Sequence, residues 1–313
     1  MRTRRRVIAA AIESTEGTPE AITAADGGLL AIDLKVDPDI TMVPRNVVMQ
    51  TLSKLPDLVG AQMARASFRA ELKGAGGAYS ATVLPAIGKY LRACGFAETV
   101  DTTGGSETVT YQPASTGLPS LTLFAYEDGV IKKMAGCRGN VKFSGKLGEP
   151  MYADFEFYGL WVGLVDGAMV APTFESTVPP VLLSAAFSVG GYSPALTSFD
   201  LDMGQTVNMR ESMNTESGYV SAEITDRNPR GTFDPEMTLV ATHDWYGLWK
   251  AGTTGAMNLG PLGATQYNQV TFTAPTLAYN KLADAERNGT ATLATDYQLG
   301  MNTGDDELVI TFS

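Results

Sequence analysis

A period-two alternation of apolar and polar residues is the feature that most constrains how this chain can fold. The segment SFRAELK at residues 67–73 sets apolar side chains against charged ones. Residues 198–202 (SFDLD) alternate in the same way, and residues 154–157 and 307–313 have the same character. Successive side chains of a strand point to opposite faces, so this pattern predicts strands with one buried face. We therefore expect a mainly β protein with strands in both halves of the chain.

Two short helices are expected beside these strands. Residues 85–94 carry an apolar stripe at helical spacing, and Gly95 follows as a stop signal. Residues 242–251 repeat the arrangement, with Thr242 as the N-cap and Gly252 as the stop. Glycine is common just after a helix because it adopts the left-handed conformation without steric cost.

The order strand, loop, strand, helix occurs twice. The first copy has strands at residues 31–34 and 68–72 around a loop with Met42 and Arg45, and the second has strands at 198–201 and 233–237 around a loop with Met209 and Arg210. This order predicts two tandem domains, residues 1–178 with a basic N-terminal arm and residues 179–313, joined near Pro179 and Pro180. On the pattern alone, duplication and chance similarity both stay open.

Composition limits the functional classes. The chain has 313 residues and a net charge of −11, which argues against ordinary nucleic-acid binding because affinity for phosphates comes from clustered Lys and Arg. No apolar run approaches the roughly 20 residues that a membrane-spanning helix needs. The apolar run after Arg2–Arg6 is shorter than the roughly 7–15 residues of a signal peptide core, so we read the basic start as a flexible arm. Cys94 and Cys137 form no CxxC motif and are expected to be buried thiols.

The sequence holds no motif for catalysis, a cofactor or a metal, and we expect none of the three. The single histidine, His243, has no Ser or Cys partner in a motif and is interpreted as a surface or capping residue. The acidic pairs Asp154/Glu156 and Asp200/Asp202 could serve glycoside hydrolysis, but carboxylates two apart on a strand also make a solvated acidic face. A carbohydrate-binding or carbohydrate-cleaving β-sandwich stays open as an alternative function.

Several segments resemble the major tail tube proteins of bacteriophages with long non-contractile tails, in their long two-domain form. A short E-x-x-x-G-T segment lies within residues 8–19 (IAAAIESTEGTP), where that family has one before its first tube strand. The most specific succession is ASFRAELKG at residues 66–74, then Leu84-Pro85, then YLRACGF at residues 90–96. Shorter similarities cover residues 111–115, 121–123, 134–141, 199–209, 225–227 and 232–233.

The resemblance implies two β-sandwich tube domains, each with a flanking helix, whose inner strands join a ring-shaped β-barrel on assembly. The chain would then be a structural virion protein, not an enzyme, whose stacked rings form a channel for DNA. Loops at residues 37–65 and 203–226, with Met42, Arg45, Met209 and Arg210, would reach the adjacent ring. Implied partners are other copies and the tape measure, terminator and distal tail proteins, in a virion tail assembled in the host cytoplasm, without membrane anchoring.

Two tube domains per chain favour a ring of three chains over a ring of six. A channel wall with carboxylates would let DNA pass without specific binding, because both carry negative charge. The candidate lumen carboxylates are Asp33, Glu71, Asp200 and Glu236, for which plain solubility on the tube exterior is the alternative. Another virion component, such as a tail terminator or a decoration protein, also stays open.

Overall fold

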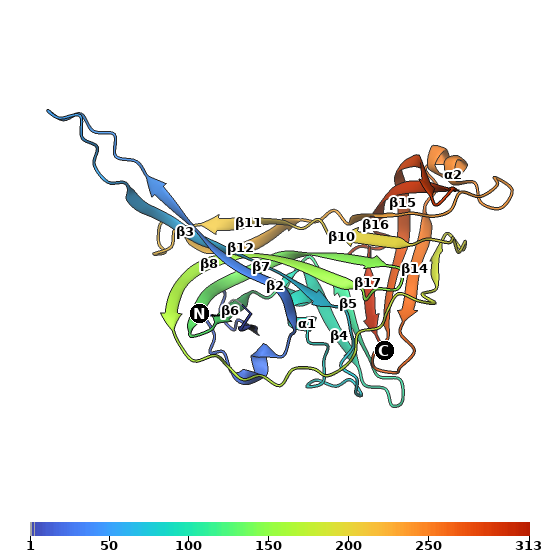
Figure 1. The fold of residues 1–313 in the computed structure, drawn as a ribbon, viewed down its shortest axis with the longest axis horizontal. Helices are drawn as coiled ribbons and strands as arrows, with labels where there is room; N and C mark the ends of the chain where they lie inside the picture. Colours follow the sequence, from blue (N-terminus) through green and yellow to red (C-terminus); the bar gives the residue numbers. More distant parts are fainter. Residues whose placement is uncertain (1, 3) are drawn as a thin grey trace.

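The computed structural model describes residue 2 and residues 4–313, and antiparallel strands dominate it (Figure 1). One sheet contains 15 strands, and β11 and β12 form a separate two-stranded sheet. The prediction of a mainly β chain with two short helices is confirmed. In chain order the elements are β1 (Arg6–Ile12), η1 (Ala24–Gly27), β2 (Ala31–Val43), β3 (Leu58–Glu71), α1 (Gly88–Ala93), β4 (Phe96–Asp101), β5 (Thr108–Pro113), β6 (Leu121–Glu127), β7 (Val130–Lys146), β8 (Tyr152–Asp166), β9 (Phe187–Val189), β10 (Ser198–Asp202), β11 (Thr206–Glu211), β12 (Tyr219–Asp226), β13 (Arg230–Phe233), α2 (Trp245–Ala251), β14 (Gly255–Leu262), β15 (Val270–Arg287), β16 (Thr290–Gly300) and β17 (Val309–Phe312).

The same strand pairing occurs twice along the chain. In the first half the paired strands run in the order β1, β6, β7, β8, β3, β2. In the second half they run in the order β9, β14, β15, β16, β13, β10. The helix follows the equivalent strand in each half, α1 after β3 and α2 after β13. The strand–loop–strand–helix order of the sequence thus belongs to a larger repeated unit.

Two strand pairs join the halves into one sheet. Strand β7 of the first half pairs with β10 of the second, and β5 of the first pairs with β17 near the C-terminus. The β4–β5 hairpin has no counterpart in the second half. The expected boundary at residues 178 and 179 falls in the connection between β8 and β9.

Aromatic side chains fill equivalent places in the two cores. Phe68 on β3 packs against Tyr90 of α1 and Phe155 of β8, with ring centroids 5.3 and 5.2 Å apart. Phe233 on β13 packs against Trp245 of α2 and Tyr297 of β16, at 6.2 and 5.6 Å. Such tilted and offset ring pairs add to the stabilisation that apolar burial provides. Each helix therefore covers the buried face of its own half of the sheet.

Both helices are shorter than the sequence predicts. Helix α1 begins at Gly88 rather than at residue 85, and Gly95 follows it with a φ of 84°. The N-cap of α2 is Asp244, whose side chain accepts a hydrogen bond from the backbone N of Gly247 at 2.8 Å. The expectation that Thr242 caps this helix is wrong, because Asp244, two residues further on, directly precedes the first buried residue, Trp245. The stop at Gly252 is confirmed by its left-handed conformation.

The two segments expected to be long loops are β-hairpins. Strand β2 continues to Val43 and β3 begins at Leu58, so only residues 44–57 between them are irregular. This hairpin projects away from the rest of the molecule in Figure 1. In the second half, β11 and β12 form a hairpin that lies against the first half, where the backbone N of Gln62 donates to the carbonyl O of Ser217 at 2.9 Å. Equivalent segments therefore have different surroundings.

The described residues of the basic N-terminus contact other residues of the same chain. The Arg5 guanidinium is 2.6 Å from the Asp128 carboxylate, and β1 begins at Arg6. The expectation of a flexible arm thus fails at Arg5 and Arg6, because an ion pair and strand pairing with β6 hold them. Residues 1 and 3 lie outside the described residues.

Truncation of Phe68 tests the aromatic core. Phe68 is 3% exposed. We expect Phe68→Ala to lower the free energy of unfolding by about 3–5 kcal/mol, because it leaves a cavity in place of a ring that packs against three aromatic neighbours. Chemical denaturation measures the change. Val48→Ala, at a fully exposed position, is the control and should stay within about 0.5 kcal/mol of the unsubstituted chain. A change under 1 kcal/mol for Phe68→Ala would contradict this packing.

Candidate functional site

One face of the sheet is lined by polar side chains from both halves. A shallow hollow on this face lies across β2, β3, β8, β7 and β10. These side chains alternate with buried apolar ones, so they point away from the core and its helices. The polar residues that line the hollow are Asp33, Lys35, Ser67, Arg69, Asn140, Lys142, Asp154, Glu156 and Asp202.

The arginines Arg65 and Arg69 of this polar face are paired with carboxylates, whereas Lys35 and Lys142 form no ion pair among the described residues. The Arg65 guanidinium is 2.6 Å from Glu156, and that of Arg69 is 2.7 Å from Asp154. The hydrogen bond that each arginine donates to its carboxylate raises the pKa of that arginine above the ordinary value. The polar face therefore presents arginines that already have anionic partners. The same pairing engages Asp154 and Glu156, the first of the two acidic pairs considered for glycoside hydrolysis.

The four candidate lumen carboxylates all belong to this polar face. Glu71 and Asp200 alternate with buried neighbours on β3 and β10. Asp33 lies at a bulge of β2 with a φ of 53° and lines the hollow beside Arg69. Glu236 follows β13, where the Arg287 side chain of β15 donates to it at 2.9 Å. The structure thus places three of them over the first-half sheet or the joint and Glu236 beyond it, and their role in a lumen stays a prediction.

The four candidate inter-ring residues are divided between the two hairpins. Met42 lies near the end of β2 and is 50% exposed, and Arg45 is in the irregular segment that follows. Met209 and Arg210 lie on β11, opposite Ala222 and Ser221 of β12. The structure does not bring Met42 and Arg45 together with the two residues of β11. Contact with a neighbouring ring stays a prediction for both pairs.

The two halves are joined by a strand pair, and the strands equivalent to the two members of this pair have unpaired edges elsewhere in the molecule. Strand β7 pairs with β10 over residues 142–146 and 198–202. By the repeated pairing order, β15 corresponds to β7, and β2 corresponds to β10. Residues 281–287 of β15 pair with β16 on one side only, and β2 pairs with β3 only, among all strands of the described chain. The molecule therefore carries one copy of this joint and the two separate halves of another.

Identical residues confirm the correspondence of the strands at these edges. Asp37 of β2 lies opposite Arg65 of β3, and Asp202 of β10 lies opposite Arg230 of β13. Lys142 of β7 corresponds to Ala283 of β15. In each half, this residue follows the one that is aligned, across the intervening strand β8 or β16, with the core phenylalanine. Asp200 therefore corresponds to Lys35 and not to Asp33, which a residue-by-residue match of segments 31–34 and 198–201 would suggest; a bulge at Asp33 and Leu34 contributes one residue to this shift.

A buried carboxylate shapes the first-half surface on which the second hairpin lies. Glu13 accepts hydrogen bonds from the backbone N of Gly17 at 2.8 Å and of Gly136 at 2.7 Å, and from the hydroxyl of Ser120 at 2.5 Å. A Cβ on Gly17, whose φ is 74°, would lie 2.4 Å from the carbonyl O of Val220 on β12. The E-x-x-x-G-T segment therefore builds the turn on which this hairpin lies, a role that residue spacing alone did not reveal.

Glu16 and Arg138 complete this contact. Arg138 donates to Glu16 at 2.7 Å and to the carbonyl O of Ala222 at 2.6 Å, and the Ser221 hydroxyl also donates to Glu16. Burial opposes ionisation of Glu16, but the hydrogen bonds from Ser221 and Arg138 outweigh it and lower its pKa. Charged hydrogen bonds thus join β12 to β7 in addition to apolar packing.

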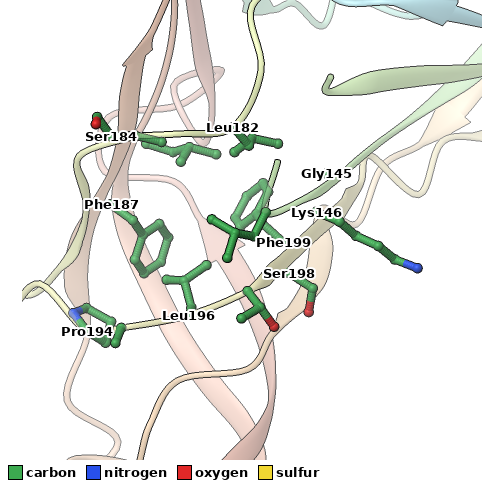
Figure 2. A pocket seen from close by; sticks show the side chains of 14 residues that line it. Gly145, Lys146, Leu182, Ser184, Phe187, Pro194, Leu196, Ser198 and Phe199 are labelled. Atoms are coloured by element: carbon green, nitrogen blue, oxygen red, sulfur yellow. The ribbon is translucent and has the colours of Figure 1, made fainter. Parts of the chain in front are cut away.

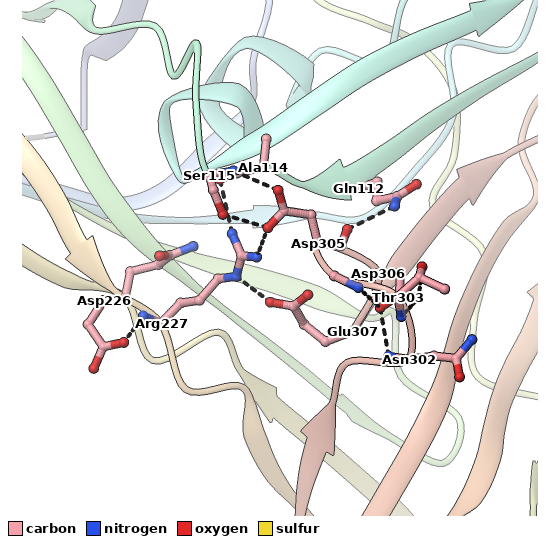
Figure 3. A network of polar contacts seen from close by, with 12 residues as sticks. Gln112, Ala114, Ser115, Asp226, Arg227, Asn302, Thr303, Asp305, Asp306 and Glu307 are labelled. Atoms are coloured by element: carbon pink, nitrogen blue, oxygen red, sulfur yellow. Dashed lines mark hydrogen bonds and ion pairs between the residues drawn. The ribbon is translucent and has the colours of Figure 1, made fainter.

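Arg227, in the connection between β12 and β13, is the centre of a second network (Figure 3). Its guanidinium is bonded to the carboxylates of Asp305 and Glu307 and donates to the carbonyl O of Ala114 at 3.0 Å. Asp305 also accepts from the Ser115 hydroxyl at 2.6 Å. Burial would lower the pKa of Arg227, but its two carboxylate partners outweigh burial and raise it. The network connects the second hairpin, the segment before β17 and the end of β5.

The lone histidine belongs to an aromatic cluster. The His243 ring stacks on Tyr192 with centroids 4.4 Å apart and lies 4.3 Å from Trp245. Burial lowers the pKa of His243 below 6.5. A surface or capping role is therefore replaced by packing beneath α2. Cys94 and Cys137 are free and buried, as expected, and burial raises the pKa of both thiols.

The described residues contain no cluster of three or more His, Cys, Asp or Glu side chains placed to hold a metal ion. Within the same residues, none of the helices has the length and hydropathy to cross a membrane.

Replacement of Arg227 tests the second network. We expect Arg227→Ala to lower the free energy of unfolding by about 2–3 kcal/mol, since Glu307, only 6% exposed, loses its charged partner. Chemical denaturation at pH 7 measures the loss. Arg5→Ala removes an exposed ion pair and, as the control, should cost under about 1 kcal/mol. Equal losses for the two variants would contradict a buried role for Arg227.

The same network predicts a pH dependence. Hydrogen bonds from Ser115 and Arg227 lower the pKa of Asp305 below 3.8 in the folded chain. A carboxyl with a lowered folded pKa stabilises the fold above its unfolded pKa, and this contribution disappears as the pH falls through the folded value. We therefore expect the unsubstituted chain to lose more stability than Arg227→Ala when denaturation at pH 5 is compared with pH 3. Parallel losses would refute the coupling.

Comparison with known proteins adds the family. A model of the family described as phage tail tube protein matches residues 3–307, which is nearly the whole chain. No curated protein matches the chain. The mainly β architecture with its large antiparallel sheet agrees with that family. The chain belongs to the phage tail tube protein family and is a structural component of a virion tail.

Proposed function

We propose that three copies of the chain close into a ring by pairing β2 of each copy with β15 of the next, and that such rings stack into the tail tube. Assembly takes place in the host cytoplasm, and the protein acts without catalysis, cofactor or membrane anchor. Its partners are other copies and the tape measure, terminator and distal tail proteins. The two tandem tube domains, residues 1–178 and 179–313, are the repeating units of this ring.

The single observation that carries the proposal is the β7–β10 joint. It shows how a first-half sheet and a second-half sheet fit edge to edge. The unpaired edges of β15 and β2 are the corresponding strands, so a second copy can supply the missing half of the same joint. An unpaired strand edge is a template for pairing with another chain, and ring closure removes it.

The part of the β2 edge that is able to pair ends at the same position as the paired part of β10 in the internal joint. Strand β10 ends at Asp202, where the backbone turns at residues 203–205 toward β11. The equivalent of Met203 on β2 is Pro38, which has no backbone N–H to donate. Pairing across copies would therefore end after Asp37, as the internal pairing ends after Asp202.

Two sheets per chain support a ring of three rather than six copies. The family resemblance implies six tube domains around a ring, and each chain contributes two. Alternating joints, within a chain and between chains, then close the circle with three chains, which is cyclic symmetry with one repeated interface.

The polar face supplies the channel wall in this arrangement. Helices cover the opposite, buried face, so the polar face is the one left to line the opening. Arg65, Arg69 and Arg287 are paired with carboxylates and offer little to phosphates. Asp33, Glu71 and Asp200 add negative charge, and Glu236 offsets that of Arg287. DNA would pass such a wall without specific binding.

A cysteine pair tests the ring. Asp37→Cys with Ala283→Cys places two thiols directly opposite each other across the proposed joint, at the roughly 4.5–5.5 Å Cα separation of paired strands, which a disulfide can span. We expect oxidation of the assembled protein to give covalent dimers and trimers, and nothing larger, on a non-reducing denaturing gel.

The single variants Asp37→Cys and Ala283→Cys are the controls, and each should stay monomeric on the gel because Cys94 and Cys137 are buried. Covalent hexamers would replace the three-chain ring by a six-chain ring. Absence of any cross-link in protein that forms tubes by negative-stain microscopy would refute the β2–β15 joint.

A further inference from the structure

Two cationic side chains of the first half bind backbone carbonyls of β2. The guanidinium of Arg6 on β1 donates to the carbonyl O of Leu34 at 2.9 Å, and the ammonium of Lys132 on β7 donates to that of Val36 at 3.0 Å. Both cations also lie 3.5 Å from the Glu127 carboxylate. One carboxylate thus serves two cations, and backbone oxygens complete their hydrogen bonding.

The carbonyls of Leu34 and Val36 point to the side of β2 that has no neighbour. Their equivalents on β10 are Phe199 and Leu201, and the residue between these, Asp200, has its carbonyl O against the backbone of β13. Successive residues of a strand direct their backbone groups to opposite sides. Residues 199 and 201 therefore face β7, and residues 34 and 36 face the free edge. The two cations cover the acceptors that a second copy would use.

The free edge of β15 carries two carboxylates that match these cations. In the register of the internal joint, Asp284 would lie opposite Val36 and Glu286 opposite Leu34. Asp284 accepts a hydrogen bond from the hydroxyl of Tyr246 on α2 at 2.6 Å, so it lies on the helix-covered side of the sheet. Glu286, two residues further on, has the same orientation. Both carboxylates are exposed in the single chain.

The cations approach β2 from this same side. Strand β1 lies on the helix-covered side of the first half, since Lys89 of α1 donates to the carbonyl O of Ala10 at 2.6 Å. Arg6 begins this strand, and the carboxylate that it shares with Lys132 keeps the two cations together. Pairing of β15 with β2 would therefore bring two carboxylates of one copy to two cations of the next.

The internal joint is apolar at the corresponding positions. Phe143 and Gly145 of β7 stand where β15 has its two carboxylates. Phe143 is fully buried and packs against Phe272 with ring centroids 5.1 Å apart. Figure 2 shows the apolar side chains that surround a cavity of about 190 Å³ beside Gly145, among them Leu182, Phe187, Leu196 and Phe199. The joint within the chain thus differs in chemistry from the edges that remain free.

We propose that Arg6 and Lys132 of one copy bind the carboxylates of Asp284 and Glu286 of the next copy, and that they release the carbonyls of β2 as β15 pairs there. The proposal rests on the three-chain ring and assigns the charged contact in its joint. Backbone N–H groups of β15 replace the side chains on the released carbonyls, so no acceptor stays unpaired. In a single copy the same cations protect the edge, as charged side chains do on exposed edge strands. Complementary charge then directs the edge to another copy of this chain.

Charge reversal on β15 tests the contact. In the chain with Asp37→Cys and Ala283→Cys, we expect Asp284→Lys with Glu286→Lys to lower the yield of covalent dimers and trimers at least tenfold, because like charges would then meet in each joint. The yield is compared at a protein concentration where the parent chain, which carries only the two cysteines, is half cross-linked. Both carboxylates are exposed, so circular dichroism and chemical denaturation should not change.

Glu211→Lys with Glu223→Lys is the matched control. These carboxylates are exposed on the β11–β12 hairpin, and their reversal changes the net charge by the same amount. The control should cross-link like the parent chain. Unchanged cross-linking for Asp284→Lys with Glu286→Lys would overturn the contact and leave the ring intact. Absence of cross-links in the parent chain would instead overturn the ring and, with it, this contact.

Neutral substitution of the cations separates binding from mere protection of the edge. Arg6→Gln with Lys132→Gln removes both charges and keeps hydrogen-bond donors. We expect this pair to lower the cross-link yield at least threefold, and to have no further effect in a chain with Asp284→Asn and Glu286→Gln, because the carboxylates are then already absent. A higher yield would show that the cations only protect the edge and would overturn the contact. Equal losses in both backgrounds would overturn it as well.

Discussion

Backbone pairing between β7 and β10 is the interaction on which the rest of the structure depends. It brings five residues of each strand into register and makes one sheet from the two halves. Because the pairing runs along the strand edge, it also fixes the direction and register of the second-half strands relative to those of the first half. The polar face is continuous across the chain for this reason.

The same pairing explains why the two hairpins differ. Beyond β10, the chain turns at residues 203–205 and β11–β12 lies on the first half, where Gly17 lies close to the β12 backbone and Arg138 donates a hydrogen bond to it. The β2–β3 hairpin has no equivalent surface within its own chain, because the neighbour that would lie beside β2 is not part of it. Its exposed residues are therefore the expected state of an unassembled copy.

The sequence predicts local structure well and long-range structure poorly here. Alternation located β10 at residues 198–202, and the helix stops at Gly95 and Gly252 follow from backbone conformation, which a residue type reports directly. Pairing partners are not local properties, so neither the β7–β10 joint nor the anchoring by Glu13 could be read from spacing. The Thr242 cap failed because Asp244 also has a capping side chain and lies where Trp245 begins to be buried. The candidate lumen carboxylates could be placed on one face by parity, whereas the pairing of Glu236 with Arg287 depends on a strand that is distant in the sequence.

Two structurally similar units within one chain can differ in sequence at equivalent positions. If six identical units formed a ring, every hairpin would have to serve the same contact, and a substitution in one would occur in all. In a chain with two units, one hairpin can be held on its neighbour by hydrogen bonds from Arg138 and to Glu16 and by close contact at Gly17 and Gly136, while the other remains available. The internal joint also forms with the folding of the chain, without the loss of translational freedom that joining separate copies costs. Half of the joints in a ring would then be made before any two copies meet, so the affinity that assembly requires falls on the β2–β15 edge alone.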